Sequence, residues 1–299
     1  NMSNINLSNT KVIPYPFLKN FKNEIVYGGY FTALLGPALV IATAIITKTN
    51  LSIPLLAISY LIPLMVYSFD YYQDMDKDRE SNQERAAHLN RKVKIYPYIM
   101  GSYLLLLVIL LLVFSNLMMI LYILFLIMVG VLYPLGLKRF TQIIPAFKNI
   151  YTVFIWSLAG SFSVTFFNGL NLNLTYILIF LFIFLKMLPN AIFFDIKDIE
   201  SDRKEGLKTL PALLGRKKTI QFLKTMNILA FIPVFVGIYL KIFPVFTVIM
   251  LIFLFYSFYY LDKSDEMKDK EMKINYYLFA DAEFILWPFI LILGNFFFQ

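Results

Sequence analysis

Two groups of aspartates are the residues of this sequence best suited to chemistry. Their members recur three or four positions apart, so a helix would bring most of each group onto one face. Carboxylates that lie so close repel one another unless a cation neutralises them, and Mg²⁺ prefers such oxygen ligands. The spacing therefore predicts a two-sided Mg²⁺ site whose metal ligands and catalytic residues are Asp70, Asp74, Asp78, Asp195, Asp198 and Asp202. The remaining acid of the first group, Asp76, would point away from that face.

The composition indicates a membrane protein. Of the 299 residues, 59% are hydrophobic and the mean hydropathy is +0.69. Soluble domains contain only roughly 45–50% apolar residues. The sequence has no cysteine and a single histidine, His88. The composition therefore excludes disulfides and thiolate chemistry, and it disfavours a histidine-based metal site.

Nine apolar stretches divide the chain, each of roughly 20 residues and long enough to cross a hydrocarbon layer of about 30 Å as a helix. They are residues 25–47, 51–72, 95–114, 116–133, 150–168, 174–194, 220–240, 242–261 and 276–298. The predicted fold class is therefore an all-α polytopic membrane protein with nine transmembrane helices. Residues 1–23 are polar and are expected to form a cytosolic leader, followed by a single membrane domain over residues 24–299.

The charges between these stretches predict the orientation. If every stretch spans the membrane, 23 of the 27 basic residues fall on one side, together with both aspartate groups. Only Lys48 and Lys241 fall in loops on the other side. By the positive-inside rule the basic side faces the cytoplasm. The net charge of +8 thus has a topological explanation, and no nucleic-acid partner is predicted.

The two aspartate groups also indicate an internal duplication. Asp74-x-x-x-Asp78-Arg79 follows the second stretch, and Asp198-x-x-x-Asp202-Arg203 follows the sixth. Four spans separate the two motifs, which predicts two four-helix repeats plus a ninth helix. An even number of intervening spans places both motifs on the same face of the membrane.

Acidic helix ends beside many basic residues favour a ligand with several negative charges bridged through Mg²⁺. A diphosphate satisfies this requirement, because basic side chains can bind the oxygens that the metal leaves free. The candidates for this role are Lys138, Arg139, Lys148, Arg203 and Lys208. Lys186 and Asn190, one turn apart in the sixth stretch, are predicted to line a cavity that leads toward the second aspartate group. The aromatic-rich spans suit a hydrocarbon tail, so the ligand as a whole would be a prenyl diphosphate.

The second aspartate motif resembles that of a known family. The run is Asp195-x-x-Asp198-x-x-x-Asp202, followed by Gly206-x-Lys208-Thr209-x-Pro211. It is similar to the second motif of the UbiA superfamily of intramembrane prenyltransferases. The segment from Tyr133 to Arg139, with Lys148 beyond it, resembles the region before that family's fifth helix. In the first motif, Asp70 stands where the family has Asn and Tyr71 where it has Asp.

This resemblance implies nine helices around a central cavity, Mg²⁺ as the cofactor and an active site that faces the cytoplasm. It implies transfer of a polyprenyl group, such as geranylgeranyl, from its diphosphate to a lipophilic acceptor, with release of diphosphate. Arg85, Tyr71 and Tyr133 join the expected substrate-binding residues. The acceptor stays open among an aromatic quinone precursor, a prenylated glycerol phosphate and a carotenoid.

Two other functions would also use acidic residues in or beside the membrane. A CDP-alcohol phosphotransferase-like enzyme also uses membrane aspartates, but neither motif here has the glycine framework of that class. A transporter would use the acids and the lysine inside the spans, which are Lys186, Asp281 and Glu283. The grouping of aspartates at one membrane face beside basic residues favours the prenyltransferase interpretation.

Overall fold

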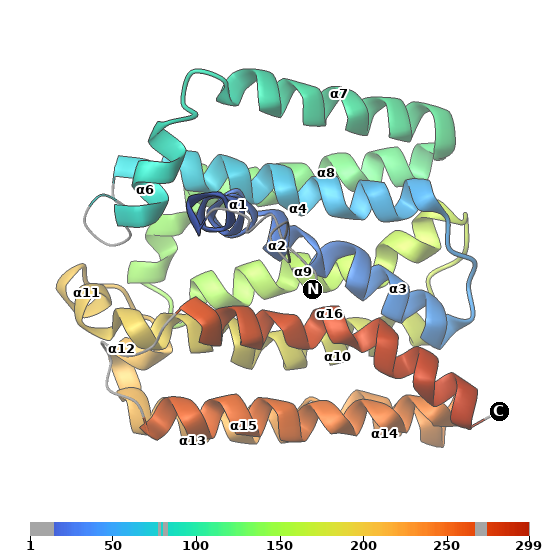
Figure 1. The fold of residues 1–299 in the computed structure, drawn as a ribbon. Helices are drawn as coiled ribbons and strands as arrows, with labels where there is room; N and C mark the ends of the chain where they lie inside the picture. The colour runs from blue at the N-terminus through green and yellow to red at the C-terminus, as the bar shows by residue number, and fades with distance from the viewer. Residues whose placement is uncertain (1–14, 77–78, 80–82, 267–273, 299) are drawn as a thin grey trace, which may run out of the picture.

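The computed structural model describes residues 15–76, 79, 83–266 and 274–298. Within these ranges every regular element is a helix, and nine helical segments are long and apolar enough to cross a membrane. The prediction of an all-α protein with nine spans is therefore confirmed. Figure 1 shows the long helices running along a common direction. Of the predicted leader, residues 1–14 lie outside the described residues.

The first four spans come from the part of the chain before residue 136. A short helix, α6, lies in the connection between the second and third spans. The helices are α1 (Tyr15–Tyr27), α2 (Tyr30–Ala33), α3 (Leu35–Thr47), α4 (Ile53–Gln73), α6 (Gln83–Asn90), α7 (Tyr96–Phe114) and α8 (Leu117–Leu135).

The other five spans follow, and some of them contain more than one helical segment. The helical segments of this part of the chain, including those in the connections, are η1 (Leu137–Gln142), α9 (Phe147–Phe167), α10 (Leu174–Phe193), η2 (Phe194–Asp198), α11 (Ile199–Lys204), α12 (Leu210–Leu214), α13 (Arg216–Leu229), α14 (Ile232–Tyr239), η3 (Val245–Leu251), α15 (Ile252–Glu266) and α16 (Ile274–Phe297). Here η1, η2 and η3 are 3₁₀ segments.

The first span differs from the continuous helix predicted over residues 25–47. Helix α1 ends at Tyr27, and Gly29 takes a left-handed backbone with φ 80° before α2 begins. Glycine adopts this conformation without the clash that a side chain would cause. Helix α1 consequently turns away from the span, and Figure 1 shows it nearly end-on beside the long helices.

Apolar side chains fill two contiguous cores. One joins α3, α4, α7 and α8 with one end of α9 and of α10, and Ile58 and Ile123 are fully buried in it. The other joins α3, α9, α10 and the helices from α13 to α16, with Phe182 and Trp287 stacked at 4.9 Å between ring centres. Burying these side chains stabilises the fold, and α3, α9 and α10 contribute to both cores.

The outward faces of the helices remain apolar, as a lipid environment requires. On α7, Leu105 and Leu112 are 62% and 71% exposed. Large exposed apolar surfaces are unfavourable in water but are suited to hydrocarbon. Together with the nine spans, this identifies an integral membrane protein.

Close contact between α3 and α4 depends on Gly36. A methyl group added at this position would lie 2.0 Å from the backbone oxygen of Ser59. We expect Gly36→Ala to lower the free energy of unfolding by about 1–3 kcal/mol, because the added atom overpacks the contact. Thermal unfolding of the detergent-purified protein measures this.

The matched control is Gly101→Ala on α7, where the added methyl group meets nothing within 4 Å. It should leave stability unchanged or raise it, since alanine favours helix more than glycine does. Equal melting temperatures for the two variants would contradict the close α3–α4 contact.

Candidate active site

Both aspartate groups lie at the same end of the helix bundle. The carboxyl end of α4 carries the first group, and η2 with α11 carries the second. Figure 1 shows α6, α11 and α12 together at this end. The prediction that the two motifs share one face therefore agrees with the structure.

The first acidic arm is the end of α4. Asp70 is half-buried near the end of the helix. The helix ends at Asp74, whose backbone N–H donates to the backbone carbonyl of Asp70 at 2.9 Å. Lys138 Nζ lies 2.6 Å from Asp74 Oδ2. Asp78 lies outside the described residues. Asp76 is directed away from the site, with an 84% exposed side chain that pairs with Arg79 at 3.4 Å.

The second acidic arm changes its helical form as it leaves the membrane. Helix α10 ends at Phe193, and the 3₁₀ segment η2 carries Asp195 and Asp198 into α11, which holds Asp202. The sequence analysis assumed that the three acids lie on one continuous α-helix. In the structure they lie on a 3₁₀ segment and a separate short α-helix. Asp195 is only 2% exposed, whereas Asp198 is half-buried.

Asp195 is held by two neighbouring residues at the start of α9. Lys148 Nζ lies 3.0 Å from its Oδ1, and the Asn149 amide donates to its Oδ2 at 2.8 Å. Asn149 also donates to the Ala191 oxygen at 3.0 Å, which joins α9 to α10. These bonds fix the carboxylate in one orientation, as a preformed ligand requires.

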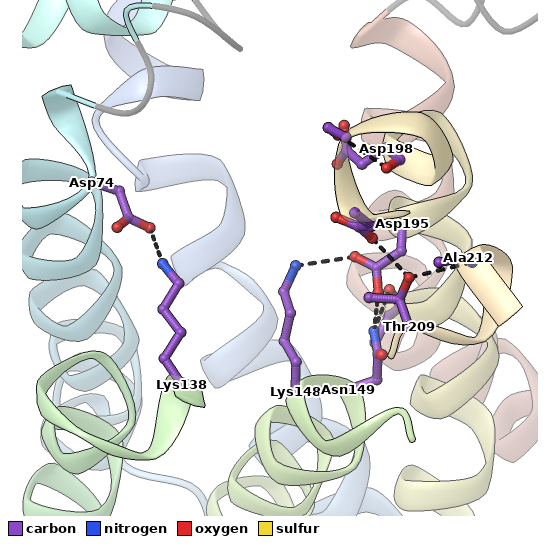
Figure 2. A network of polar contacts seen from close by, with 11 residues as sticks. Asp74, Lys138, Lys148, Asn149, Asp195, Asp198, Thr209 and Ala212 are labelled. Carbon is purple, nitrogen blue, oxygen red and sulfur yellow. Dashed lines mark hydrogen bonds and ion pairs between the residues drawn. The ribbon is translucent and has the colours of Figure 1, made fainter. Parts of the chain in front are cut away.

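Two lysines stand between the acidic arms. Figure 2 shows Lys138 and Lys148 pointing into the space between Asp74 on one side and Asp195 on the other. Arg85, on α6, lies beside the carboxyl end of α4. Its guanidinium lies 4.6 Å from the ring centre of Tyr71. The two acidic arms and two of the predicted basic residues, Lys138 and Lys148, therefore face one gap.

Helix α6, which carries Arg85, is attached to α1 by polar contacts. Tyr27 donates to Glu84 at 3.0 Å, and His88 Nε2 lies 3.0 Å from Glu24 Oε2, which also pairs with Lys92. Burial, with the hydrogen bond to Glu84, raises the pKa of Tyr27 to about 12. Tyr27 therefore stays a neutral donor at physiological pH, and α1 acts as a support for α6.

A cavity of about 210 Å³ opens from the gap into the apolar layer. Asp70 and Lys148 lie at its polar end, and Ser59 lines it farther along α4. Asp70 lies eleven positions after Ser59, which corresponds to roughly 16 Å of helix. Four aromatic residues are part of its wall, namely Tyr67, Tyr133, Tyr151 and Trp156.

Hydrogen bonds hold part of this wall in place. Trp156 Nε1 donates to the Tyr67 oxygen at 3.1 Å, and the Tyr151 hydroxyl donates to the Val129 oxygen at 2.7 Å. The rings of Tyr133 and Tyr151 stack at 5.5 Å. The Tyr133 hydroxyl is buried, and the Thr141 side chain is a polar neighbour of it.

Three of the predicted basic residues have other contacts. Arg139 is exposed and lies over the ring of Phe140, and Arg203 donates from Nε to the Ala212 oxygen at 2.8 Å. Lys208 Nζ donates to the Ile143 oxygen at 3.1 Å. The contacts of Arg203 and Lys208 join neighbouring loops, and among the described residues none of the three contacts an aspartate of the site. The sequence shows their charge but not the backbone groups that engage them.

The prediction that Lys186 lines the substrate cavity is wrong. Its ammonium lies 2.8 Å from Glu283 and also donates to Ser257 at 2.7 Å. Both charged side chains are only 1% exposed, and Lys186 does not line the cavity. An ammonium in hydrocarbon requires a counter-charge, and α16 provides one. Asn190 is likewise buried, beside Asp281 rather than on the cavity wall.

Sequence reasoning missed Asn149, Thr209 and Trp156 as residues of the site. Thr209 donates to Asp202 at 2.7 Å and accepts from the Ala212 N–H, which orients the last aspartate of the second arm. Asn149 follows Lys148 and Thr209 follows Lys208, in segments that resemble the family. Their position in these segments could have identified them as residues of the site. Nothing in the sequence pattern distinguishes Trp156 from an ordinary packing residue.

The donor set fits a divalent cation bound jointly with its ligand. All the candidate donors are carboxylates, which suit Mg²⁺. Over the part of the chain that the structure describes, no three acidic or histidine side chains form a metal cage by themselves. Proteins commonly hold Mg²⁺ through one or two carboxylates plus oxygens of a phosphate substrate. Two acidic arms that face each other across a gap suit that arrangement.

The fold and the site together define a polytopic membrane protein with an acidic and basic site at the mouth of an apolar cavity. The model of the UbiA prenyltransferase family matches residues 94–279. The chain therefore belongs to the UbiA prenyltransferase family.

Among curated relatives, digeranylgeranylglyceryl phosphate synthase of Methanosphaera stadtmanae is 35% identical over 118 residues. The matched part covers 38% of this chain and 43% of that relative, which is less than half of each.

Solved structures share the fold. An apo UbiA homolog from Aeropyrum pernix K1 has a TM-score of 0.68 at 13% identity, covering 89% of this chain and 97% of that one. A UbiA homolog from Archaeoglobus fulgidus, bound to DMAPP and Mg²⁺, has a TM-score of 0.61 at 19% identity, covering 92% and 99%.

The buried pair of Lys186 and Glu283 allows a direct test of its role in stability. Glu283→Gln leaves an ammonium in the membrane interior without its carboxylate, and we expect it to lower the free energy of unfolding by about 3–5 kcal/mol. Denaturant unfolding in mixed micelles gives the value. The double variant Lys186→Met/Glu283→Gln removes both charges and should recover most of the loss. A single variant as stable as the parent would show that the pair is not formed.

Proposed function

We propose that this protein transfers a prenyl group from a prenyl diphosphate to a lipophilic acceptor at the cytoplasmic face of the cell membrane, with Mg²⁺ as the cofactor. The observation that carries the proposal is the placement of the two acidic arms, which face each other at the polar end of an apolar, aromatic-walled cavity. A molecule that fits both environments has a polyanionic head and a hydrocarbon tail.

Asp70, Asp74, Asp195, Asp198 and Asp202 would hold the metal, together with Asp78, which lies outside the described residues. Bound Mg²⁺ would neutralise the diphosphate and stabilise the charge that develops on it as the allylic C–O bond breaks. Lys138 and Lys148 would release their carboxylate partners, Asp74 and Asp195, and bind the diphosphate oxygens inside the gap. Arg85 would contact the same head from α6.

The cavity wall would protect and stabilise the allylic carbocation. The faces of Tyr67, Tyr133, Tyr151 and Trp156 carry partial negative charge, which attracts a cation that lies against them. The apolar surroundings exclude water, so that the acceptor rather than water reaches the cation. The tail would extend along α4 toward Ser59.

For the acceptor, we propose a prenylated glycerol phosphate. The support is the similarity to digeranylgeranylglyceryl phosphate synthase over 118 residues. Such a molecule would supply a hydroxyl as the attacking group, and its own phosphate would suit the basic residues on this face. Incubating the protein with geranylgeranyl diphosphate and a panel of glycerol phosphate, aromatic and carotenoid acceptors tests this choice.

The transporter alternative loses its main support. It required Lys186, Asp281 and Glu283 to act on a transported substrate, but Lys186 and Glu283 neutralise each other inside the bundle.

Asp198→Asn tests the role of the second arm with little disturbance, because Asp198 is only half-buried. We expect Mg²⁺-dependent release of diphosphate from geranylgeranyl diphosphate to fall by about 10²–10³-fold, the scale seen when one group that stabilises developing charge is removed. The matched control is Asp262→Asn, since Asp262 is an exposed acid that pairs with Lys224 on the same side of the membrane. Full turnover by the Asp198 variant, or an equal loss in the control, would contradict the proposal.

A further inference from the structure

The membrane face opposite to the aspartates has an uncompensated positive charge. Its connections, residues 48–52, 115–116, 168–173 and 240–244, contain two basic residues, Lys48 and Lys241, and no acidic residue. Neither lysine has an ion-pair partner among the residues that the structure describes. Figure 1 places the connections at the ends of α3 and α14 at the end of the bundle away from α6 and α11.

The fold brings these two lysines into one pocket, although 193 positions separate them in the chain. The pocket has a volume of about 370 Å³. Its other polar residues are Thr47, Asn173, Thr175 and Tyr176. Apolar residues, Ile242 and Phe243 among them, complete the wall beside Lys241. Two cations and several hydrogen-bonding groups therefore surround one polar depression at the membrane surface.

Both lysines have an unusual backbone. Lys48 has φ 53° and Lys241 has φ 57°, and of the residues with described placement only one other non-glycine, Ala146, has positive φ. Each lysine follows the end of a helix, where the N–H of Lys48 donates to Ile45 at 3.3 Å and that of Lys241 to Ile238 at 3.0 Å. Glycine is the usual residue at such a position.

Capping of the helix dipole is the simplest explanation for a cation at these sites. The free energy gained from the helix dipole is no larger than the free energy that a residue with a side chain loses by adopting a left-handed backbone. Capping by itself therefore does not favour lysine over glycine. It also gives no reason for the two side chains to share a pocket. A common anionic ligand accounts for both features.

The start of α10 adds a third positive element. Asn173 caps the helix by accepting from the Thr175 N–H at 3.0 Å, and both residues line the pocket. The first turn of a helix presents N–H groups without partners in the helix, and its dipole favours an anion there. The helix start and the two lysines thus act on the same space.

We propose that this pocket binds the phosphate of an anionic lipid headgroup in the leaflet opposite to the active site. A phosphate accepts hydrogen bonds on several oxygens, which suits ammonium groups, hydroxyls and helix N–H groups that converge from different elements. Headgroup phosphates are present at this level of the membrane, and the apolar wall next to Lys241 suits the attached hydrocarbon. Bound lipid would tie together the ends of α3, α10 and α14.

Native mass spectrometry of the full chain in detergent tests the proposal with phosphatidylglycerol and phosphatidylcholine as probes. We expect the parent to retain phosphatidylglycerol in preference to phosphatidylcholine. Lys48→Gln/Lys241→Gln should weaken phosphatidylglycerol binding at least tenfold. The matched control is Lys217→Gln/Lys218→Gln, which removes two exposed lysines from the start of α13, and it should change binding less than twofold.

Two further measurements complete the test. Lys48→Arg/Lys241→Arg keeps both charges and should retain binding, which separates loss of charge from misfolding. Inorganic phosphate added at the lipid concentration should not displace the lipid, because it lacks the hydrocarbon contacts. Displacement would assign the pocket to free phosphate and overturn the lipid assignment. Unchanged lipid binding in the double glutamine variant would overturn the proposal as a whole.

Discussion

Carboxylates gathered at the edge of a hydrocarbon layer must be neutralised, and the arrangement of this protein follows from that requirement. Desolvated like charges repel strongly, so each acidic arm is stable only beside a cation. The structure satisfies the arms with lysines of its own, Lys138 for Asp74 and Lys148 for Asp195. Lys138 lies in η1, between α8 and α9, and Lys148 lies in the first turn of α9, so this one stretch of chain holds the two halves of the site in register. Metal ions and a diphosphate would replace these contacts with stronger ones.

The same requirement explains the fate of charges elsewhere in the bundle. Lys186 and Glu283 lie deep in the second apolar core and neutralise each other, with Ser257 donating to the carboxylate at 2.7 Å. Asp70 differs, because it lies at the polar end of the cavity together with Lys148. Depth and access therefore separate a charge that stabilises the fold from one that is available to a ligand. Residue type alone does not separate them.

The sequence predicted the number of spans, their approximate bounds and the common face of the two acidic arms, because hydropathy and loop charge report membrane topology directly. It did not predict the break at Gly29 or the 3₁₀ segment after Phe193, since both depend on local backbone geometry. The sequence analysis also assigned Arg139, Arg203 and Lys208 to the diphosphate. Lys138 and Lys148 do face the gap, whereas Arg203 and Lys208 hold backbone carbonyls of neighbouring loops. Periodicity shows which face a side chain occupies but not its tertiary partner.

The central claim is that the two acidic arms act on a single bound headgroup. The most direct test is a double-mutant cycle on Mg²⁺-dependent pyrophosphate binding, measured by titration calorimetry for the parent, Asp74→Asn, Asp198→Asn and the double variant. If one headgroup bridges both arms, the loss in the double variant should differ from the sum of the single losses by at least about 0.5 kcal/mol, as expected for residues that share a ligand. Strict additivity would mean that the arms bind independently, and it would contradict the account.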